Sequence, residues 1–227
     1  MAICTTDNRV EDDWMDIGKS VYNPTGTKYY TEPIQGCVKN CFFMAALVSV
    51  AWAANTKLKI HPVYQFHNGN SWDPSFEINK DLAVDTTDNL VYGRTSSQYI
   101  WPCLYEKAYA KWKDAPDHRD EPPIGIILNG GNGIHALQNI CGGTRYSNTT
   151  TPGLTIPVNP RSGNKTIYPS VAYTKKSPES SQLTSNHTYS VLRITGDGWE
   201  LRNPCTGSLI YIPTIDANNF DEWGYVK

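Results

Sequence analysis

The strongest hydrophobic signal in the chain is the stretch from residue 41 to residue 54. Every residue of this stretch except Ser49 is apolar, and none carries a charge. The run is well short of the roughly 20 residues that a helix needs to cross a bilayer. Because its apolar residues follow one another without a polar face, the pattern predicts a helix buried on all sides and no membrane span.

Further elements are predicted on both sides of this helix. Helical spacing of Ile100, Leu104 and Ala108 predicts a second helix over residues 97–113, with Pro102 in its first turn. A short third helix should begin at Ile134 and stop at the following diglycine. Alternating polar and apolar positions predict strands within residues 60–79, near 166–174, and over 187–194, 199–203 and 209–213. Residues 1–33 are predicted to form an irregular leader.

This order, with helices first and strands second, predicts an α+β fold. We expect two lobes that together form one core, with a cleft between them. Residues 1–150 would form the helical lobe and residues 151–227 the β-rich lobe. The boundary is indicated by residues 144–182, which are dense in Pro, Gly, Asn, Ser and Thr.

Composition excludes several function classes. The 227 residues carry a net charge of −2, and no Lys or Arg cluster occurs along the chain, so nucleic acid and anionic membrane are poor partner candidates. None of the six cysteines forms a CxxC pair, which argues against a zinc or thioredoxin-like motif. If one cysteine stays free, five remain, an odd number that cannot all pair in disulfides. This favours a reducing compartment, and the cytoplasm over secretion.

Cys41 heads the buried helix, where the helix dipole and unpaired backbone N–H groups favour a thiolate, the form that attacks carbonyl groups. Gln35 lies six residues earlier and could donate to the oxyanion of a tetrahedral intermediate. An isolated cysteine in an apolar helix is more often structural, however. A catalytic role therefore requires a base from elsewhere in the chain.

Of the five histidines, His187 is the strongest candidate for this base because it opens a regular strand. The neighbouring predicted strand ends at Asn203, and a bend at Asn203-Pro204 could bring the two side chains together. An Asn that binds one imidazole nitrogen fixes the tautomer and directs the other nitrogen toward a thiol. The other four histidines are predicted to be structural or exposed.

Four segments carry a family resemblance. The segment QGCVKNCFFMAAL is similar to the calpain active-site signature, and IWPCLYEKAYAK resembles a calpain helix that a diglycine follows. NHTYSVLRI resembles the calpain GHAYSV segment, and LRNP matches the start of LRNPWG. The resemblance covers residues 30–205 and implies a papain-like cysteine peptidase fold. It implies a calpain-like endopeptidase acting on proteins or peptides, with Cys41 as nucleophile, His187 as general base and acid, Asn203 as orienting residue and Gln35 as oxyanion donor.

The chain also departs from the family pattern. Cys205 stands where the family has the tryptophan that shields the His–Asn hydrogen bond, so Trp199 or Trp223 would have to replace it. Whether Cys37 or Cys205 forms a disulfide is left open. Glu32 is the candidate calcium ligand of the first lobe, but no acidic partner is found near residues 98–99, so no calcium requirement is predicted. Two alternatives stand beside the peptidase: acyl transfer or isopeptide cleavage on the same fold, and a non-enzymatic calpain-like binding module.

Overall fold

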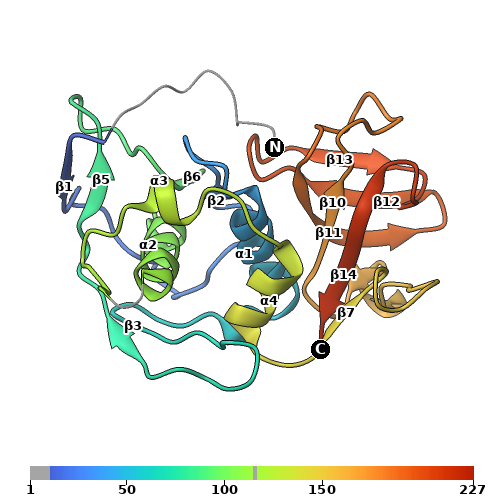
Figure 1. Cartoon of the computed structure of the whole chain (residues 1–227), viewed down its shortest axis with the longest axis horizontal. Coiled ribbons are helices and arrows are strands. Elements are labelled where there is room, and N and C mark those ends of the chain that lie inside the picture. The colour runs from blue at the N-terminus through green and yellow to red at the C-terminus, as the bar shows by residue number, and fades with distance from the viewer. Residues whose placement is uncertain (1–10, 115–116) are drawn as a thin grey trace.

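The computed structural model describes residues 11–114 and 117–227, and Figure 1 shows helices gathered on one side and a large sheet on the other. The helices are α1 (Cys41–Ala53), α2 (Trp101–Lys113), α3 (Ile124–Ile127) and α4 (Gly133–Cys141), with 3-10 turns η1 (Asn55–Lys57) and η2 (Pro160–Ser162). Three two-stranded sheets accompany the helices: β1 (Asp13–Met15) with β5 (Leu82–Val84), β2 (Pro33–Ile34) with β6 (Arg94–Thr95), and β3 (Val63–Tyr64) with β4 (Phe76–Glu77). This content confirms the α+β class.

The large sheet is antiparallel throughout and is built from residues 145–226. Its strands are β7 (Arg145–Ser147), β8 (Val158–Asn159), β9 (Lys165–Thr166), β10 (Ser170–Thr174), β11 (Thr188–Thr195), β12 (Gly198–Arg202), β13 (Leu209–Ile212) and β14 (Phe220–Val226). They lie in the order β13-β12-β11-β10-β14-β7, and β8 and β9 form a hairpin that joins β11 through β9. β7 belongs to this sheet although it precedes residue 150, where the helical lobe was predicted to end.

α1 is buried on every side from Cys41 to Ala51, as its uninterrupted apolar run predicts. α2 begins at Trp101, four residues later than predicted, with Pro102 in its first turn. α4 begins at Gly133 and ends where predicted, because Gly142 takes a φ of +69° that side chains other than glycine rarely adopt. These three helices supply most of one hydrophobic core, and a second, smaller core lies within the sheet.

Hydrogen bonds fasten α1 to the large sheet. Ser49 Oγ donates to Ser170 O on β10 at 2.9 Å and accepts from the backbone N–H of Ser170 at 2.6 Å. Ser190 Oγ on β11 donates to Ala45 O at 2.7 Å, and Trp52 Nε1 donates to Leu192 O at 2.9 Å. The only polar residue within the apolar run therefore binds the sheet, which fixes the helix in rotation and along its axis.

Some strands lie outside the predicted ones. The leader was predicted to be irregular, but Asp13–Met15 forms β1 against β5, and Pro33–Ile34 begins a further pair; residues 1–10 of the leader lie outside the described part of the chain. β14 was not predicted, because adjacent acidic residues and Gly224 interrupt its polar–apolar alternation. It forms because β10 and β7 supply backbone partners on its two edges.

Within residues 11–114 and 117–227, every helix is too short or too polar to cross a membrane.

Replacing Ser49 tests the fastening of α1 to the sheet. We expect Ser49→Ala to lower the free energy of unfolding by about 1–3 kcal/mol, because buried polar groups of Ser170 lose their partner. Denaturant unfolding would measure this loss. The control is Ser162→Ala, because Ser162 is exposed and its change should stay within about 0.5 kcal/mol. Equal stabilities for the two variants would contradict the assigned role of Ser49.

Candidate active site

Cys41 is the first residue of α1 and is fully buried. Its Sγ lies 4.0 Å from Thr188 Oγ1, at the start of β11. Burial raises the pKa of the thiol, while hydrogen bonds from Thr188 and from the backbone N–H of Phe42 act in the opposite direction. The sequence predicted a favoured thiolate at this helix N-terminus. In the structure the thiol is favoured instead, because desolvation outweighs the hydrogen-bond donors.

His187 and Asn203 meet in a buried hydrogen bond. His187 precedes β11 and Asn203 follows β12, and their atoms Nε2 and Oδ1 lie 3.0 Å apart. The ladder between the two strands pairs Ser190 with Arg202, so its continuation would place His187 opposite Cys205. The chain turns after β12 instead, with Asn203 N–H bonded to Ser208 O and Gly207 N–H bonded to Asn203 O. This turn provides the bend that the sequence suggested.

The hydrogen bonds of Asn203 define the tautomer of His187. Asn203 Oδ1 also accepts the backbone N–H of Cys205 at 2.9 Å, which fixes the orientation of the amide. His187 Nε2 must therefore donate, and Nδ1 carries the free lone pair. Nδ1 is buried and has no hydrogen-bond partner within the described residues, Cys41 included. Burial lowers the pKa of His187 to about 4, and the bond to Asn203 partly opposes this shift.

The His187–Asn203 pair is covered by sulfur and by a tyrosine ring. Cys205 Sγ lies 3.8 Å from His187 Nε2 and 3.5 Å from Gln35 Oε1, and Cys205 is disulfide-bonded. The Tyr189 ring stands perpendicular to the imidazole, with 5.0 Å between the centroids. Trp199 and Trp223, the predicted substitutes for the missing indole, pack against the core of the sheet instead.

Gln35 is held next to this pair by the segment that follows β12. Its backbone N–H donates to Pro204 O at 2.8 Å, and its side-chain Nε2 donates to Val38 O at 2.5 Å. Buried Arg202 adds two bonds to the strand that leads to Gln35, from Nη1 to Pro33 O at 2.9 Å and from Nη2 to Thr31 O at 2.6 Å. The position of Gln35 therefore depends on residues about 170 positions later in the chain.

Glu32, the candidate calcium ligand, is buried among neutral donors. Its Oε1 accepts from Ser97 Oγ at 2.9 Å, and its Oε2 accepts from Tyr29 N at 3.0 Å and from Trp101 Nε1. Within the described ranges, no three His, Cys, Asp or Glu side chains converge as metal ligands. Glu32 instead links the segment before β2 to the start of α2.

The structure thus gathers the predicted residues Gln35, Cys41, His187 and Asn203 around the start of α1 and the adjoining ends of β11 and β12. Sequence analysis missed Thr188, which contacts the thiol, and Tyr189, which contacts the imidazole. Both follow His187 directly in the sequence, and that adjacency was the available signal. Sequence analysis also missed the two hydrogen bonds by which Arg202 holds the strand before Gln35. The sequence carried no signal for them, because the partners of Arg202 are backbone carbonyls distant along the chain.

The buried imidazole has a testable effect on stability. Because the pKa of His187 falls from 6.5 to about 4 on folding, the unfolded chain binds more protons between these pH values. The contribution of His187 is therefore complete above pH 6.5 and is lost as pH falls toward 4. Glu106, whose pKa burial raises to about 7, acts in the opposite direction. The effect of His187 must therefore be read from the difference in free energy of unfolding between the original chain and a variant that lacks this histidine.

We expect the free energy of unfolding of His187→Gln, subtracted from that of the original chain, to reveal this loss. Denaturant titrations at half-unit steps from pH 7 to pH 4 would measure it. A difference that does not change with pH would show that His187 is not buried in the neutral form.

Comparison with known proteins identifies the family of the chain. A search of curated proteins finds no match. Residues 18–200 match the family described as calpain family cysteine protease. The matched segment contains Gln35, Cys41 and His187 and ends shortly before Asn203. Because the match covers most of the 227 residues, the chain belongs to the calpain family of cysteine proteases.

Proposed function

We propose that the chain is a cysteine endopeptidase that hydrolyses peptide bonds of proteins through a thioester on Cys41. The observation that carries this proposal is the hydrogen bonding of His187. Its Nε2 is bound to Asn203, and its Nδ1 is buried with an unused lone pair. The next residue, Thr188, contacts the Cys41 thiol. A base fixed in this tautomer is what activation of a thiol requires.

In the proposed reaction, Nδ1 of His187 takes the proton of the Cys41 thiol as the sulfur attacks the peptide carbonyl carbon. The carbonyl oxygen becomes an oxyanion, which the backbone N–H of Cys41 and the side-chain amide of Gln35 would stabilise. The intermediate then collapses: the C–N bond breaks, and the leaving amine takes the proton from His187. Water deprotonated by His187 attacks the thioester, which releases the carboxylic acid and restores the thiol.

Proton transfer during attack suits the charges at this site. Burial raises the pKa of Cys41 and lowers that of His187, so both groups are neutral near pH 7. A preformed thiolate–imidazolium pair is therefore disfavoured in this state, and the imidazole acts as a general base. We further propose the papain-like arrangement, in which residues 1–150 supply the nucleophile and residues 151–227 supply His187 and Asn203.

The first test is labelling with a peptidyl epoxide that alkylates active-site thiols. We expect one adduct, at Cys41, and none on Cys41→Ala, with and without calcium. Cys103→Ala is the matched control and should label like the original chain, because burial raises the pKa of Cys103 far above its usual value. Mass spectrometry of the digested protein locates the adduct. Labelling that persists in Cys41→Ala would refute the assignment of the nucleophile.

A second test concerns Asn203 as a positioning residue. We expect Asn203→Ala to lower kcat about 10- to 100-fold with little change in KM, because the imidazole loses its orientation. The hydrogen bond to Asn203 raises the pKa of His187, so its removal should move the acid limb of the pH–rate profile to lower pH. A purely structural role would leave that limb in place. Asn203→Gln, which keeps the amide, tests for partial rescue.

The second candidate function is a non-enzymatic calpain-like binding module. One observation favours it: Cys41 and His187 are both fully buried and make no hydrogen bond with each other. This candidate predicts an unreactive Cys41 and no turnover at any calcium concentration. The labelling experiment separates the two functions. Transfer to an amine acceptor would be recognised by the mass of the products from a peptide library.

A further inference from the structure

A pocket of about 380 Å³ lies between the helices and the start of β7. Its wall includes Phe42, which directly follows Cys41, and the glycine loop before α4. The loop is anchored next to the nucleophile, since Gly130 N–H donates to Lys39 O at 3.0 Å. A Cβ on Gly131 would lie only 2.7 Å from the Phe42 ring, so only glycine lets the loop approach this closely. These contacts tie one wall of the pocket to the segment that carries Cys41, although Cys41 itself does not line the pocket.

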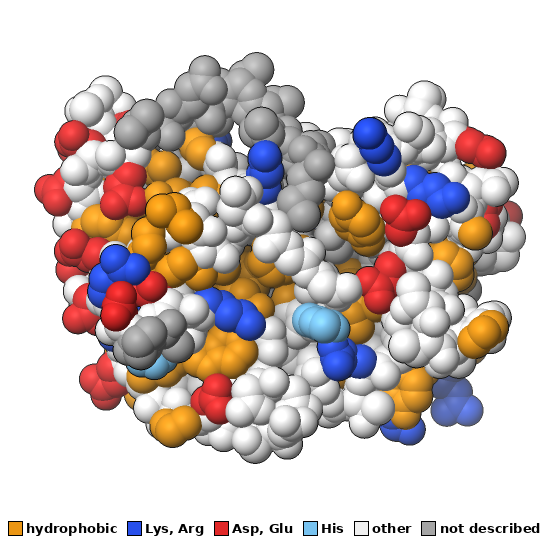
Figure 2. All heavy atoms as spheres, viewed as in Figure 1, with side chains coloured by type: hydrophobic (Ala, Val, Ile, Leu, Met, Phe, Trp, Pro, Cys, Tyr) orange, Lys and Arg blue, Asp and Glu red, His pale blue; other side chains and the backbone are white. Residues whose placement is uncertain are grey.

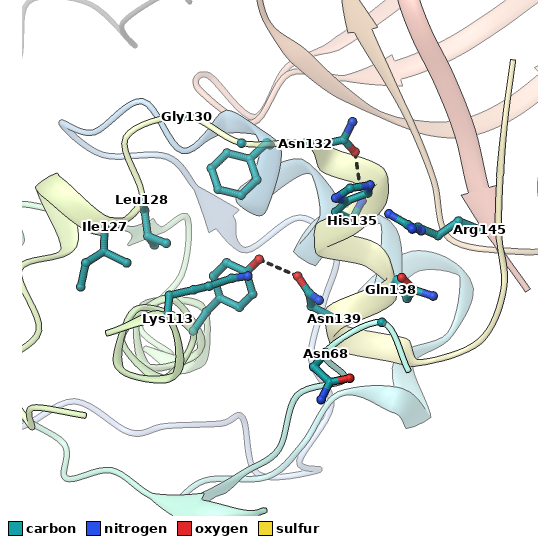
Figure 3. A pocket seen from close by; sticks show the side chains of 14 residues that line it. Asn68, Lys113, Ile127, Leu128, Gly130, Asn132, His135, Gln138, Asn139 and Arg145 are labelled. Atoms are coloured by element: carbon teal, nitrogen blue, oxygen red, sulfur yellow. Dashed lines mark hydrogen bonds between the residues drawn. The ribbon is translucent and has the colours of Figure 1, made fainter. Parts of the chain in front are cut away.

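Three basic side chains from three elements line the pocket. Lys113 comes from the end of α2, His135 from α4 and Arg145 from β7. Figure 3 shows Lys113 extending into the pocket from one side and Arg145 from the other, with His135 near Arg145. Figure 2 shows basic side chains and a histidine around a hollow near the middle of this face. The pocket lining includes no Asp or Glu.

The nearest acidic groups, Glu222 and Asp73, do not line this pocket. Glu222 Oε2 accepts from Asn132 Nδ2 at 2.5 Å, and its carboxylate lines a neighbouring pocket. Asp73 accepts from Asn68 Nδ2 at 2.7 Å and from Trp112 Nε1 at 2.8 Å. Both carboxylates accept hydrogen bonds from neutral donors and keep their charge, which acts through space. Burial lowers the pKa values of Lys113 and His135, and the charges of Asp73 and Glu222, respectively, partly oppose these shifts.

Neither Lys113 nor Arg145 forms an ion pair within the described ranges. Lys113 Nζ instead lies 4.4 Å from the centroid of the Trp112 ring. Burial lowers the pKa of His135, and the charges of Arg145 and Lys113 lower it further, while Glu222 partly opposes this shift. The pocket therefore combines positive charge with no carboxylate of its own, in a chain whose net charge is −2.

We propose that this pocket is a specificity subsite that takes a carboxylate side chain, Asp or Glu, of the peptide substrate. The inference rests on the proposed peptidase function and names the substrate feature that the site selects. A carboxylate between Lys113 and Arg145 receives charge-assisted hydrogen bonds, which are stronger than those between neutral groups. Arg145 can bind both carboxylate oxygens, while Lys113 supplies a point charge.

The test compares peptides that differ only by Glu or Gln at one position, scanned over the positions on both sides of the cleaved bond. We expect one position at which Glu raises kcat/KM about tenfold over Gln, the size of one charge-assisted hydrogen bond. This preference should shrink as salt is added. In Lys113→Gln/Arg145→Gln it should fall below about twofold, and in Lys113→Glu/Arg145→Glu a basic residue should be preferred instead.

Two control variants separate charge from structure. Lys113→Arg/Arg145→Lys retains the charges and should retain the Glu preference. Lys176→Gln/Arg161→Gln removes two exposed charges outside the pocket and should also retain it. Thermal unfolding establishes that each variant is folded. Cleavage with no Glu preference at any position would overturn the subsite, as would a preference that survives in Lys113→Gln/Arg145→Gln.

Binding to the Cys41→Ala chain distinguishes failure of the subsite from failure of the proposed function. Fluorescence anisotropy with the same Glu and Gln peptides requires no catalysis. Tighter binding of the Glu peptide that depends on Lys113 and Arg145, without cleavage by the original chain, would support the subsite and refute the peptidase. Cleavage with equal binding of the two peptides would refute the subsite alone.

Discussion

The structure depends on the burial of α1 on all of its sides. Most globular helices bury one face, whereas this helix is enclosed by the helical core and by the inner strands of the sheet. Contacts with β10 and β11 through Ser49 and Ser190 give the helix one position. Because Cys41 is its first residue, the same packing places the thiol against Thr188 at the start of β11. The packing of α1 in the core therefore also determines where the thiol of the site lies.

Burial also determines the charges at the site. The helix N-terminus and nearby N–H donors favour a thiolate, but removal of the sulfur from water favours the thiol more strongly. The same desolvation keeps His187 neutral, and Asn203 determines which of its nitrogens is basic. A neutral thiol and an imidazole with one fixed basic nitrogen are the groups that proton transfer during attack would require. The sequence indicated the participants, but their protonation states follow from burial.

The pocket beside Phe42 illustrates how local charge differs from the charge of the chain. The chain is slightly acidic and contains no cluster of basic residues along its sequence. Lys113, His135 and Arg145 are spread over more than 30 positions of the sequence. The end of α2, the first turn of α4 and the start of β7 nevertheless bring them to one pocket. Nearby Glu222 and Asp73 are bound to amide and indole groups. The charges that meet at such a pocket are therefore decided by tertiary contacts.

The sequence by itself determined the elements whose pattern is local. It predicted the buried helix from Cys41, the first turn at Pro102, the stop at Gly142 and the main strands, because apolar periodicity, proline and glycine act within a few residues. The tertiary structure decided what depends on distant partners. β14 forms although its alternation is interrupted, because strands lie on both of its edges, and Arg202 fixes the strand before Gln35 through backbone carbonyls. The protonation states of Cys41 and His187 were also decided by the tertiary structure, because the two side chains lose contact with water only once the chain has folded around them.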